Sequence, residues 1–216
     1  MATVPSLQIR DRLVLYNVPW RDYSRFLRLF ADRPGYRLTY DRGVLEIMSP
    51  SRPHDRLSRL LARIVGVIID ELGLDFSDGG STTLRRRKKH KGAEPDESFW
   101  IVNEAKMRKD EDLDLRKDPP PDLCIEVDVT HSSLDRLAIY AALGVPEVWR
   151  VNDQGLTFHV LGANGYAPAP NSLAFPLVTP SELLDLLALR EQMGVNALLR
   201  RVRAWFRKKL ADAANS

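Results

Sequence analysis

Apolar residues recur along the chain with two periods, one typical of helices and the other of strands. Spacings of three and four residues predict helices over 20–32, 54–72, 132–143 and 179–213, the last broken near Gly194. The second predicted helix has a continuous apolar stripe, so we expect one of its faces to be buried. The stripe consists of Leu57, Leu60, Leu61, Ile64, Val67, Ile68 and Leu72.

Shorter apolar runs predict β-strands. They cover residues 36–41, 43–48, 96–102, 122–129, 146–153 and 156–162. The first two form a predicted hairpin, because Gly43 can adopt the positive φ angle that the connecting turn requires. The mixed-charge segment 103–120 and the segment 163–171, which contains two prolines and a glycine, are predicted to be loops.

The order of these elements predicts an α/β fold. We expect a central mixed β-sheet flanked by helices, with a helix and hairpin at the N-terminus and a helical tail at the C-terminus. No internal repeat and no long linker divides the chain. The sequence therefore predicts a single domain over residues 1–180, followed by a basic, amphipathic helical extension over residues 181–216.

Carboxylates occupy positions where strands usually carry apolar residues. Side chains alternate along a strand, so the strand at 122–129 presents two different faces. One face carries Leu123, Ile125, Val127 and Val129, and the other carries Asp122, Cys124, Glu126 and Asp128. Asp96 opens the strand at 96–102 after a proline, and Glu46 lies within the predicted hairpin.

Carboxylates that converge in one cleft repel each other, and a divalent cation with oxygen ligands removes that repulsion. These acids therefore favour a magnesium site and the metal-assisted hydrolysis of a phosphodiester bond. The alternative is an antiparallel strand whose acidic face meets water. The four histidines are scattered without the spacing of a zinc site, and no nucleotide-binding or serine-hydrolase motif is present.

Charge and composition indicate which partners and which cellular compartment the protein is suited to. The net charge is only +3, but positive charge is concentrated in "RRRKKHK" at 85–91 and "LLRRVRAWFRKKL" at 198–210. Such clusters suit a polyanion such as nucleic acid, although most basic runs are solvated loops or helix faces. The only cysteine, Cys124, excludes an internal disulfide and fits a reducing cytoplasm. We find no secretory signal and no apolar run near the ~18 residues of a membrane span.

Several segments resemble one known family. They are "YDRGVLEIMSPSRPHDRLSRLL", "GAEPDESFWIVNEAK", "PPPDLCIEVDVTHSSLDRLAIYAALGVPEVWRV" and "NALLRRVRAWFRK". These segments are similar to the Uma-two family of restriction endonucleases, within the PD-(D/E)XK nuclease superfamily, over about residues 17–210. The resemblance implies a restriction-endonuclease-like core, a Mg²⁺ or Mn²⁺ cofactor and DNA as the substrate.

The resemblance also implies roles for individual residues. Asp96 and Glu126 would be the two metal ligands, and Glu46 would be an accessory ligand or would orient metal-bound water. The superfamily pattern places a lysine two residues after the second acid, where this chain has Asp128. Many family members have a lysine before "LALY", and here Arg136 precedes "LAIY". An arginine there holds a phosphate or offsets the acids, but it does not act as a general base.

We therefore expect a metal-dependent DNA endonuclease in the cytoplasm, without a membrane anchor. The expected catalytic residues are Glu46, Asp96, Glu126, Asp128 and Arg136. Cleavage of both antiparallel strands would suit a homodimer. The alternative is a non-catalytic nuclease-fold module that binds DNA or another partner, for which the missing lysine is the main support. An RNA substrate is a third hypothesis.

Other polar and aromatic residues are expected to have structural roles. His54 would serve the start of the long helix, and Cys124 would be a small packing residue. Tyr140 and Trp149 lie in apolar surroundings and are expected in the core. Lys106, in the predicted loop, is a distant second candidate for the missing cation.

Overall fold

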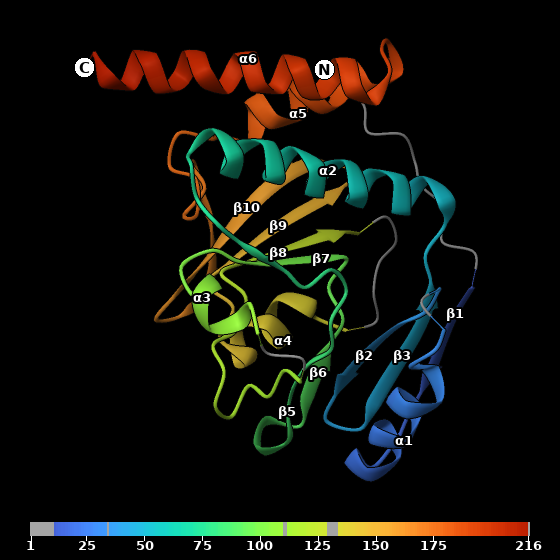
Figure 1. The fold of residues 1–216 in the computed structure, drawn as a ribbon. Coiled ribbons are helices and arrows are strands. Elements are labelled where there is room, and N and C mark those ends of the chain that lie inside the picture. Colours follow the sequence, from blue (N-terminus) through green and yellow to red (C-terminus); the bar gives the residue numbers. More distant parts are fainter. Residues whose placement is uncertain (1–10, 34, 110–111, 129–133, 216) are drawn as a thin grey trace.

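The computed structural model describes residues 11–33, 35–109, 112–128 and 134–215. Two β-sheets form its framework, and helices pack against both of them (Figure 1). One of the sheets is mixed and has helices on both of its faces. The predicted α/β class is therefore confirmed, and a second sheet adds to it.

The first sheet is antiparallel, with the strand order β1-β3-β2-β6-β5. Its strands are β1 (Asp11–Leu15), β2 (Arg37–Asp41), β3 (Val44–Ser49), β5 (Leu84–Arg86) and β6 (Lys91–Ala93). β2 and β3 form the predicted hairpin, in which Arg42 and Gly43 have φ angles of 44° and 95°. Helix α1 (Trp20–Phe30) packs on this sheet through Tyr23, whose ring stacks on that of Tyr40 with 4.5 Å between centroids.

The second sheet is mixed, with the strand order β11-β10-β9-β8-β7-β4. Its strands are β4 (Ser77–Asp78), β7 (Glu97–Trp100), β8 (Leu123–Val127), β9 (Glu147–Asn152), β10 (Gly155–Gly162) and β11 (Gly165–Ala169). β8 is antiparallel to β7 and parallel to β9, so it lies in the interior of the sheet with a neighbour on each side. This position makes both faces of β8 available for burial.

Helices α2 (Arg52–Glu71) and α4 (Arg136–Leu143) cover the two faces of β8. The face toward α2 is apolar, as predicted, with Leu123, Ile125 and Val127 in the main core; Val129 lies outside the described residues. On the opposite face, Cys124 packs with Ile139 and Tyr140 of α4. The acidic face therefore does not meet water at Glu126, which is 2% exposed, and the alternative hypothesis is wrong there.

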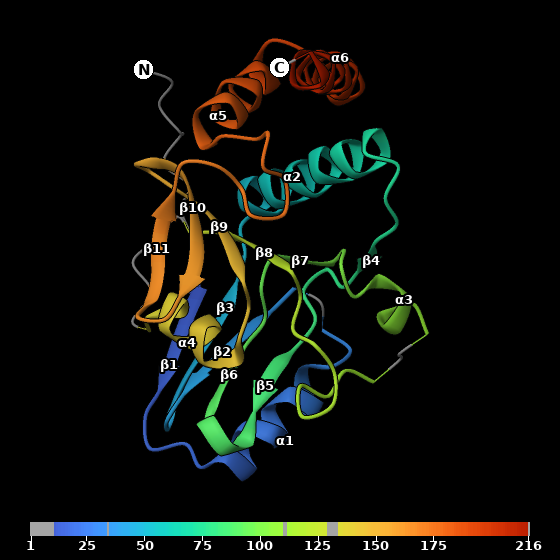
Figure 2. The same cartoon turned by 90° about the vertical axis from the view of Figure 1, so that its left-hand side faces the viewer.

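The C-terminal helices complete the main core. Helix α5 (Pro180–Ala188) is followed, after a short turn, by helix α6 (Val195–Ala214), with Gly194 as the N-cap. The predicted break near Gly194 is confirmed. Leu198, Val202 and Phe206 of α6 are buried in the same core as α2, and Figures 1 and 2 show α6 lying over that helix. No helix within the described ranges is long and apolar enough to cross a membrane.

Two predicted loops contain regular structure. Residues 163–171 include β11, and residues 103–120 include the short helix α3 (Glu104–Met107). β11 is an edge strand, where Pro168 can be accommodated because one side of the strand has no hydrogen-bonded neighbour. The short strands β1, β4, β5 and β6 were not predicted. The predicted helix at 132–143 is confirmed from Arg136 onward, and its first two residues lie outside the described residues.

One segment connects the two sheets and ends beside β8. β6 ends at Ala93 in the first sheet, and β7 begins at Glu97 in the second. Between them, Glu94 Oε2 accepts a hydrogen bond from the backbone N–H of Leu38 in β2 (2.8 Å). The backbone N–H of Asp96 donates to the carbonyl oxygen of Ile125 in β8 (3.1 Å). Asp96 is therefore fixed at the junction of the two sheets.

Candidate functional site

Asp96 is almost fully buried at this junction, with 3% of its surface exposed. Its Oδ2 accepts a hydrogen bond from the backbone N–H of Val127 (2.8 Å), which holds the carboxylate against the end of β8. Burial raises the pKa of Asp96, but the adjacent imidazole of His54 and the charge of Arg136 bring the pKa below its usual value. The buried carboxylate is therefore ionised.

His54 is the cation in contact with Asp96. It lies in the first turn of α2, where Ser51 Oγ accepts a hydrogen bond from its backbone N–H (3.5 Å). The imidazole is fully buried, and its Nε2 lies 3.2 Å from Oδ2 of Asp96. Burial lowers the pKa of His54, but the adjacent carboxylate of Asp96 and the charge of Glu126 raise it above the usual value. The expected helix-terminal role of His54 was therefore incomplete, because this side chain also holds Asp96.

Glu126 points from β8 toward α4. Its Oε2 lies 2.5 Å from Nη1 of Arg136, and its Oε1 accepts a hydrogen bond from the hydroxyl group of Tyr140. Burial raises the pKa of Glu126 to about 7; Arg136 opposes this shift, and the charge of Asp96 adds to it. Near neutral pH, this carboxylate is close to the midpoint of its titration.

Arg136 joins the two sheets. It is the first residue of α4, whose N-terminus is capped by the side chain of Asp135. Its guanidinium binds Glu126 in the second sheet, and Nη2 donates a hydrogen bond to the hydroxyl group of Thr39 in the first sheet (2.9 Å). A further donor, Nε, is buried without a hydrogen-bond partner among the described residues. A buried guanidinium with an unused N–H is suited to binding an anion.

Glu46, the third predicted acid, comes from the first sheet. It lies on β3 directly opposite Thr39 of β2 and is 1% exposed. Its Oε2 lies 3.5 Å from Nε of Arg12. Burial lowers the pKa of Arg136, but the charge of Glu126 and, less strongly, those of Asp96 and Glu46 raise it above the usual value. The three acids therefore act on the same guanidinium.

Asp128 stands where the superfamily pattern has a lysine, and it is bound to an arginine. Its backbone N–H extends the ladder of β8 by donating to the carbonyl oxygen of Val151 (2.7 Å). Its Oδ2 lies 2.5 Å from Nη2 of Arg150, which is the β9 neighbour of Glu126. A cation is thus present near the expected lysine, supplied by a different strand. The sequence pattern did not identify Arg150, whose only signal is a charge within the apolar run "EVWRV".

A pocket of about 140 Å³ lies between α4 and the ends of β8 and β9. Its polar lining includes Glu126, Asp128, Arg136, Tyr140 and Arg150. The volume exceeds that of a single water molecule, about 30 Å³, so several waters fit within it. Asp96 and Glu46 do not belong to the lining formed by the described residues, so Glu126 is the predicted metal ligand that faces this space.

The donor chemistry of the site fits a hard divalent cation. Asp96 and Glu126 are buried carboxylates on neighbouring segments. Burial raises the pKa of Glu126, and the negative charge of Asp96 raises it further. The side chains do not form a preassembled cage, because the described residues include no group of three or more His, Cys, Asp or Glu side chains placed to hold a metal ion. A cation bound by Glu126 would compete with Arg136 for the same oxygen.

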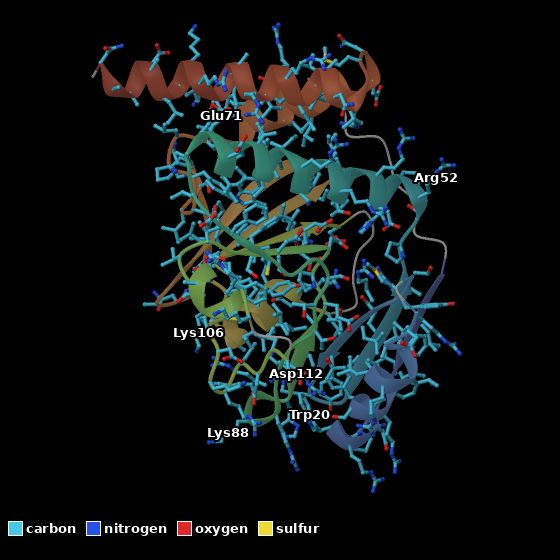
Figure 3. The ribbon with its side chains drawn as sticks, viewed as in Figure 1. Trp20, Arg52, Glu71, Lys88, Lys106 and Asp112 are labelled. Carbon is cyan, nitrogen blue, oxygen red and sulfur yellow. The ribbon has the colours of Figure 1, made fainter. Side chains whose placement is uncertain are left out.

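Three other residues singled out in the sequence lie apart from these contacts. Lys106 lies on α3, where its Nζ binds the carbonyl oxygen of Lys117 (2.6 Å) (Figure 3). Asp122 fixes the turn after β7, because its Oδ2 accepts the backbone N–H of Ile101 (2.6 Å). Cys124 is buried in the core, which raises the pKa of its thiol, as expected for a packing residue.

A family comparison covers the residues that build this site. The model of the Uma2 family, described as "Putative restriction endonuclease", matches residues 20–191. This range contains every predicted site residue, His54, Arg150 and all strands except β1; Arg12, beside Glu46, lies outside it. No curated protein matches the chain. Because the matched range covers most of the 216 residues, the resemblance seen in the sequence is confirmed, and the chain belongs to the Uma2 family.

Proposed function

We propose that this protein is a divalent-metal-dependent endonuclease that hydrolyses the phosphodiester bonds of DNA. The observation that carries the proposal is that three buried acids, Asp96, Glu126 and Glu46, come from three separate segments, and that Glu126 lines a pocket together with Arg136 and Arg150. Each of these acids faces a cation, with His54 beside Asp96, Arg136 beside Glu126 and Arg12 beside Glu46. Buried ion pairs contribute little net stability, because the cost of desolvation offsets much of their attraction, so this cluster is better explained by a function than by stability alone. Membership of a restriction-endonuclease family supports the same conclusion.

Asp96 and Glu126 would hold the metal ion, with Glu46 as an accessory ligand. When bound, Mg²⁺ or Mn²⁺ lowers the pKa of a water molecule and neutralises the charge that develops on the phosphate. His54 keeps Asp96 ionised and fixes its orientation, because its Nε2 lies beside Oδ2. Tyr140 orients Glu126 in the same way through its hydroxyl group.

Arg136 and Arg150 would bind the phosphate group of the substrate. Both line the pocket beside Glu126, and a guanidinium can donate two parallel hydrogen bonds to phosphate oxygens. Neither serves as the general base, because arginine stays protonated in proteins. Arg150, held by Asp128, would supply the positive charge that a lysine supplies in the superfamily pattern.

Plasmid cleavage and direct metal binding test this function together. Purified protein is incubated with supercoiled plasmid in Mg²⁺ or Mn²⁺, and metal binding is measured by calorimetry. We expect nicking or cutting that EDTA abolishes, and loss of both cleavage and metal binding in Asp96→Ala and Glu126→Ala. The exposed Asp153→Ala is the matched control. Cleavage that survives in Asp96→Ala, or an intact plasmid with the wild-type protein under all conditions, would overturn the proposal.

A non-catalytic DNA-binding module is the second candidate, and the existing ion pairs favour it. Glu126 is paired with Arg136, Asp96 with His54, and Asp128 with Arg150. On this hypothesis the acids hold the fold together, and DNA binding is indifferent to EDTA and to Asp96→Asn. Comparison of matched DNA and RNA substrates tests the remaining hypothesis, since an RNA-specific site would require the 2′-hydroxyl group.

A further inference from the structure

The two basic segments of the chain lie at opposite ends of the molecule. Residues 85–91 form a hairpin made of β5, a 3-10 turn (Arg87–Lys89) and β6. Residues 198–210 lie in α6, which packs over α2. Figure 3 shows Lys88 of the hairpin at one end of the molecule and Glu71, at the end of α2 beside α6, at the other. A polyanion that used one basic segment would therefore approach from a different side than one that used the other.

Acidic residues neutralise much of the charge of α6. Arg203 Nη1 lies 2.7 Å from Asp70 and 2.6 Å from Glu71, and Arg207 Nε lies 2.6 Å from the same Glu71. Lys209 Nζ lies 2.7 Å from Glu182 of α5. These cations serve to attach α6 to the helices beneath it. Among the exposed cations of α6, Arg200, Arg201 and Lys208 have no such partner within the described part of the chain.

The tip of the hairpin keeps its positive charge. Arg87, Lys88 and Lys89 are consecutive and exposed, and none has an ion pair within the described ranges. Lys91, at the start of β6, does form an ion pair: its Nζ lies 2.9 Å from Oδ1 of Asp41. Three adjacent cations without acidic neighbours create a local positive potential, which is the feature that attracts phosphate groups.

The hairpin is a fixed platform. Leu84 of β5 and Ala93 of β6 are fully buried in the core beneath α4. At the tip, His90 has a φ angle of 51°, and its carbonyl oxygen accepts the backbone N–H of Arg42 from the turn between β2 and β3 (2.9 Å). A docking surface held on two sides loses little conformational entropy when a ligand binds.

The hairpin also leads directly into the candidate site. β6 carries the chain from the basic tip to Ala93, and Asp96 follows at the junction of the sheets. We propose that residues 85–91 form a docking surface for the phosphate backbone of duplex DNA, with Arg87, Lys88 and Lys89 as the contacting cations. The inference rests on the proposed DNA substrate, and it assigns the bound duplex to the hairpin side of the molecule, with the α6 side left free. Contacts of this kind add affinity without reading the base sequence.

Two charge-matched triple variants test the proposal. One is Arg87→Ala/Lys88→Ala/Lys89→Ala in the hairpin, and the other is Arg200→Ala/Arg201→Ala/Lys208→Ala in α6. Binding to a fluorescently labelled DNA duplex of mixed sequence is measured by anisotropy in EDTA, so that cleavage plays no part. Salt is varied between ~50 and ~200 mM, because each lost phosphate contact reduces the slope of log affinity against log salt by about 0.9.

We expect the hairpin variant to lose at least ~10-fold in affinity and about 3 in salt slope, and the α6 variant to bind as the wild type does. Equal binding by the wild type and the hairpin variant, or loss confined to the α6 variant, would overturn the assignment and leave the proposed function standing. No DNA binding by the wild type would overturn it as well, and plasmid cleavage would then decide the function separately. If the hairpin variant lost binding to anionic lipid vesicles and kept its DNA binding, the hairpin would be assigned to a membrane surface instead.

Discussion

The imidazole of His54 lies 3.2 Å from the carboxylate of Asp96, so the first turn of α2 is joined electrostatically to the segment that connects the two sheets. Neither side chain reaches solvent to any useful extent. A charge buried in this way depends on its partner, because the protein interior does not replace the hydration that the charge has lost. The pair therefore contributes to stability as well as to the site.

Replacement of His54 by alanine should destabilise the protein by ~3 kcal/mol, because an ionised Asp96 would remain buried without its cation. Burial lowers the pKa of His54, but Asp96 raises it above 6.5, so the pair is fully formed below pH 6.5 and weakens as the pH rises through the folded-state pKa. The pKa of Asp96 is below 3.8, so its contribution is lost only as the pH falls through that lowered value.

Urea denaturation at two pH values measures this effect. The difference in unfolding free energy between wild type and His54→Ala should be larger at about pH 5.5 than at about pH 9. Arg56→Ala, an exposed change in the same turn of α2, is the control and should have little effect. A difference that is independent of pH would show that His54 contributes by packing alone.

Glu126 should make the protein less stable as the pH rises from about 4.5 to 7. Burial raises the pKa of Glu126 from 4.5 to about 7, so the folded state holds a proton in this range that the unfolded state has already released. The accumulated loss is on the order of 3 kcal/mol. Thermal unfolding across this range should show a smaller decline in Glu126→Gln than in wild type.

Glu97 provides a comparison for this measurement. Burial and the charge of Asp78 raise the pKa of Glu97 to about 7 as well, so Glu97→Gln should remove a separate part of the decline. The two substitutions together should flatten the profile more than either one alone. If Glu126→Gln kept the wild-type dependence of stability on pH, the raised pKa of the Glu126 carboxyl group would be contradicted.

Tyr140→Phe should reduce metal affinity and cleavage by about 10- to 100-fold, because the hydroxyl group that orients Glu126 is lost. The missing hydrogen bond also favours the protonated carboxyl group, so the acid side of the pH–activity profile should move to higher pH. Tyr166→Phe is a matched control, since Tyr166 donates its hydrogen bond to the backbone carbonyl of Val145. Equal activity of Tyr140→Phe and Tyr166→Phe would show that Tyr140 has no role in the site.

Leu198→Ala in α6 should cost ~2 to 5 kcal/mol, because Leu198 is fully buried in the core that α2 shares with the second sheet. The exposed Arg200→Ala on the same helix should change stability by no more than ~0.5 kcal/mol. Urea denaturation followed by circular dichroism and by tryptophan fluorescence measures both. Two separate transitions in the wild type would show that the C-terminal helices fold independently of the sheet.

Local pattern was enough to predict the elements with strong periodicity. The stripe of α2 and the alternation of β8 depend on nearby residues, and both are present as expected. β1 and β6 were missed because they pair with β3 and β2, which are distant in sequence. β5 pairs with its neighbour β6, but the basic run there has no alternating apolar pattern. "ANGYAPAPN" has the composition of a loop, and the edge position of β11 makes a strand possible there.

The acids of the site and Arg136 were named from the sequence, whereas the cations beside Asp96 and Asp128 were found only in three dimensions. Asp96 and Glu126 follow Pro-Asp and strand patterns that can be read locally. His54 has one local signal, its position one turn before Leu57 on the apolar stripe of α2, but nothing in its segment indicates Asp96. Arg150 reaches Asp128 because β8 and β9 are parallel neighbours, which only the fold establishes.

The segment that joins the two sheets has a consequence for how such a site can evolve. Asp96 lies on that segment, Thr39 and Glu46 belong to one sheet, and Glu126 belongs to the other. No break in the chain separates the sheets into modules that each retain a complete site. Recombination, duplication or domain exchange that divided them would divide the chemistry as well, so this arrangement is inherited whole or lost.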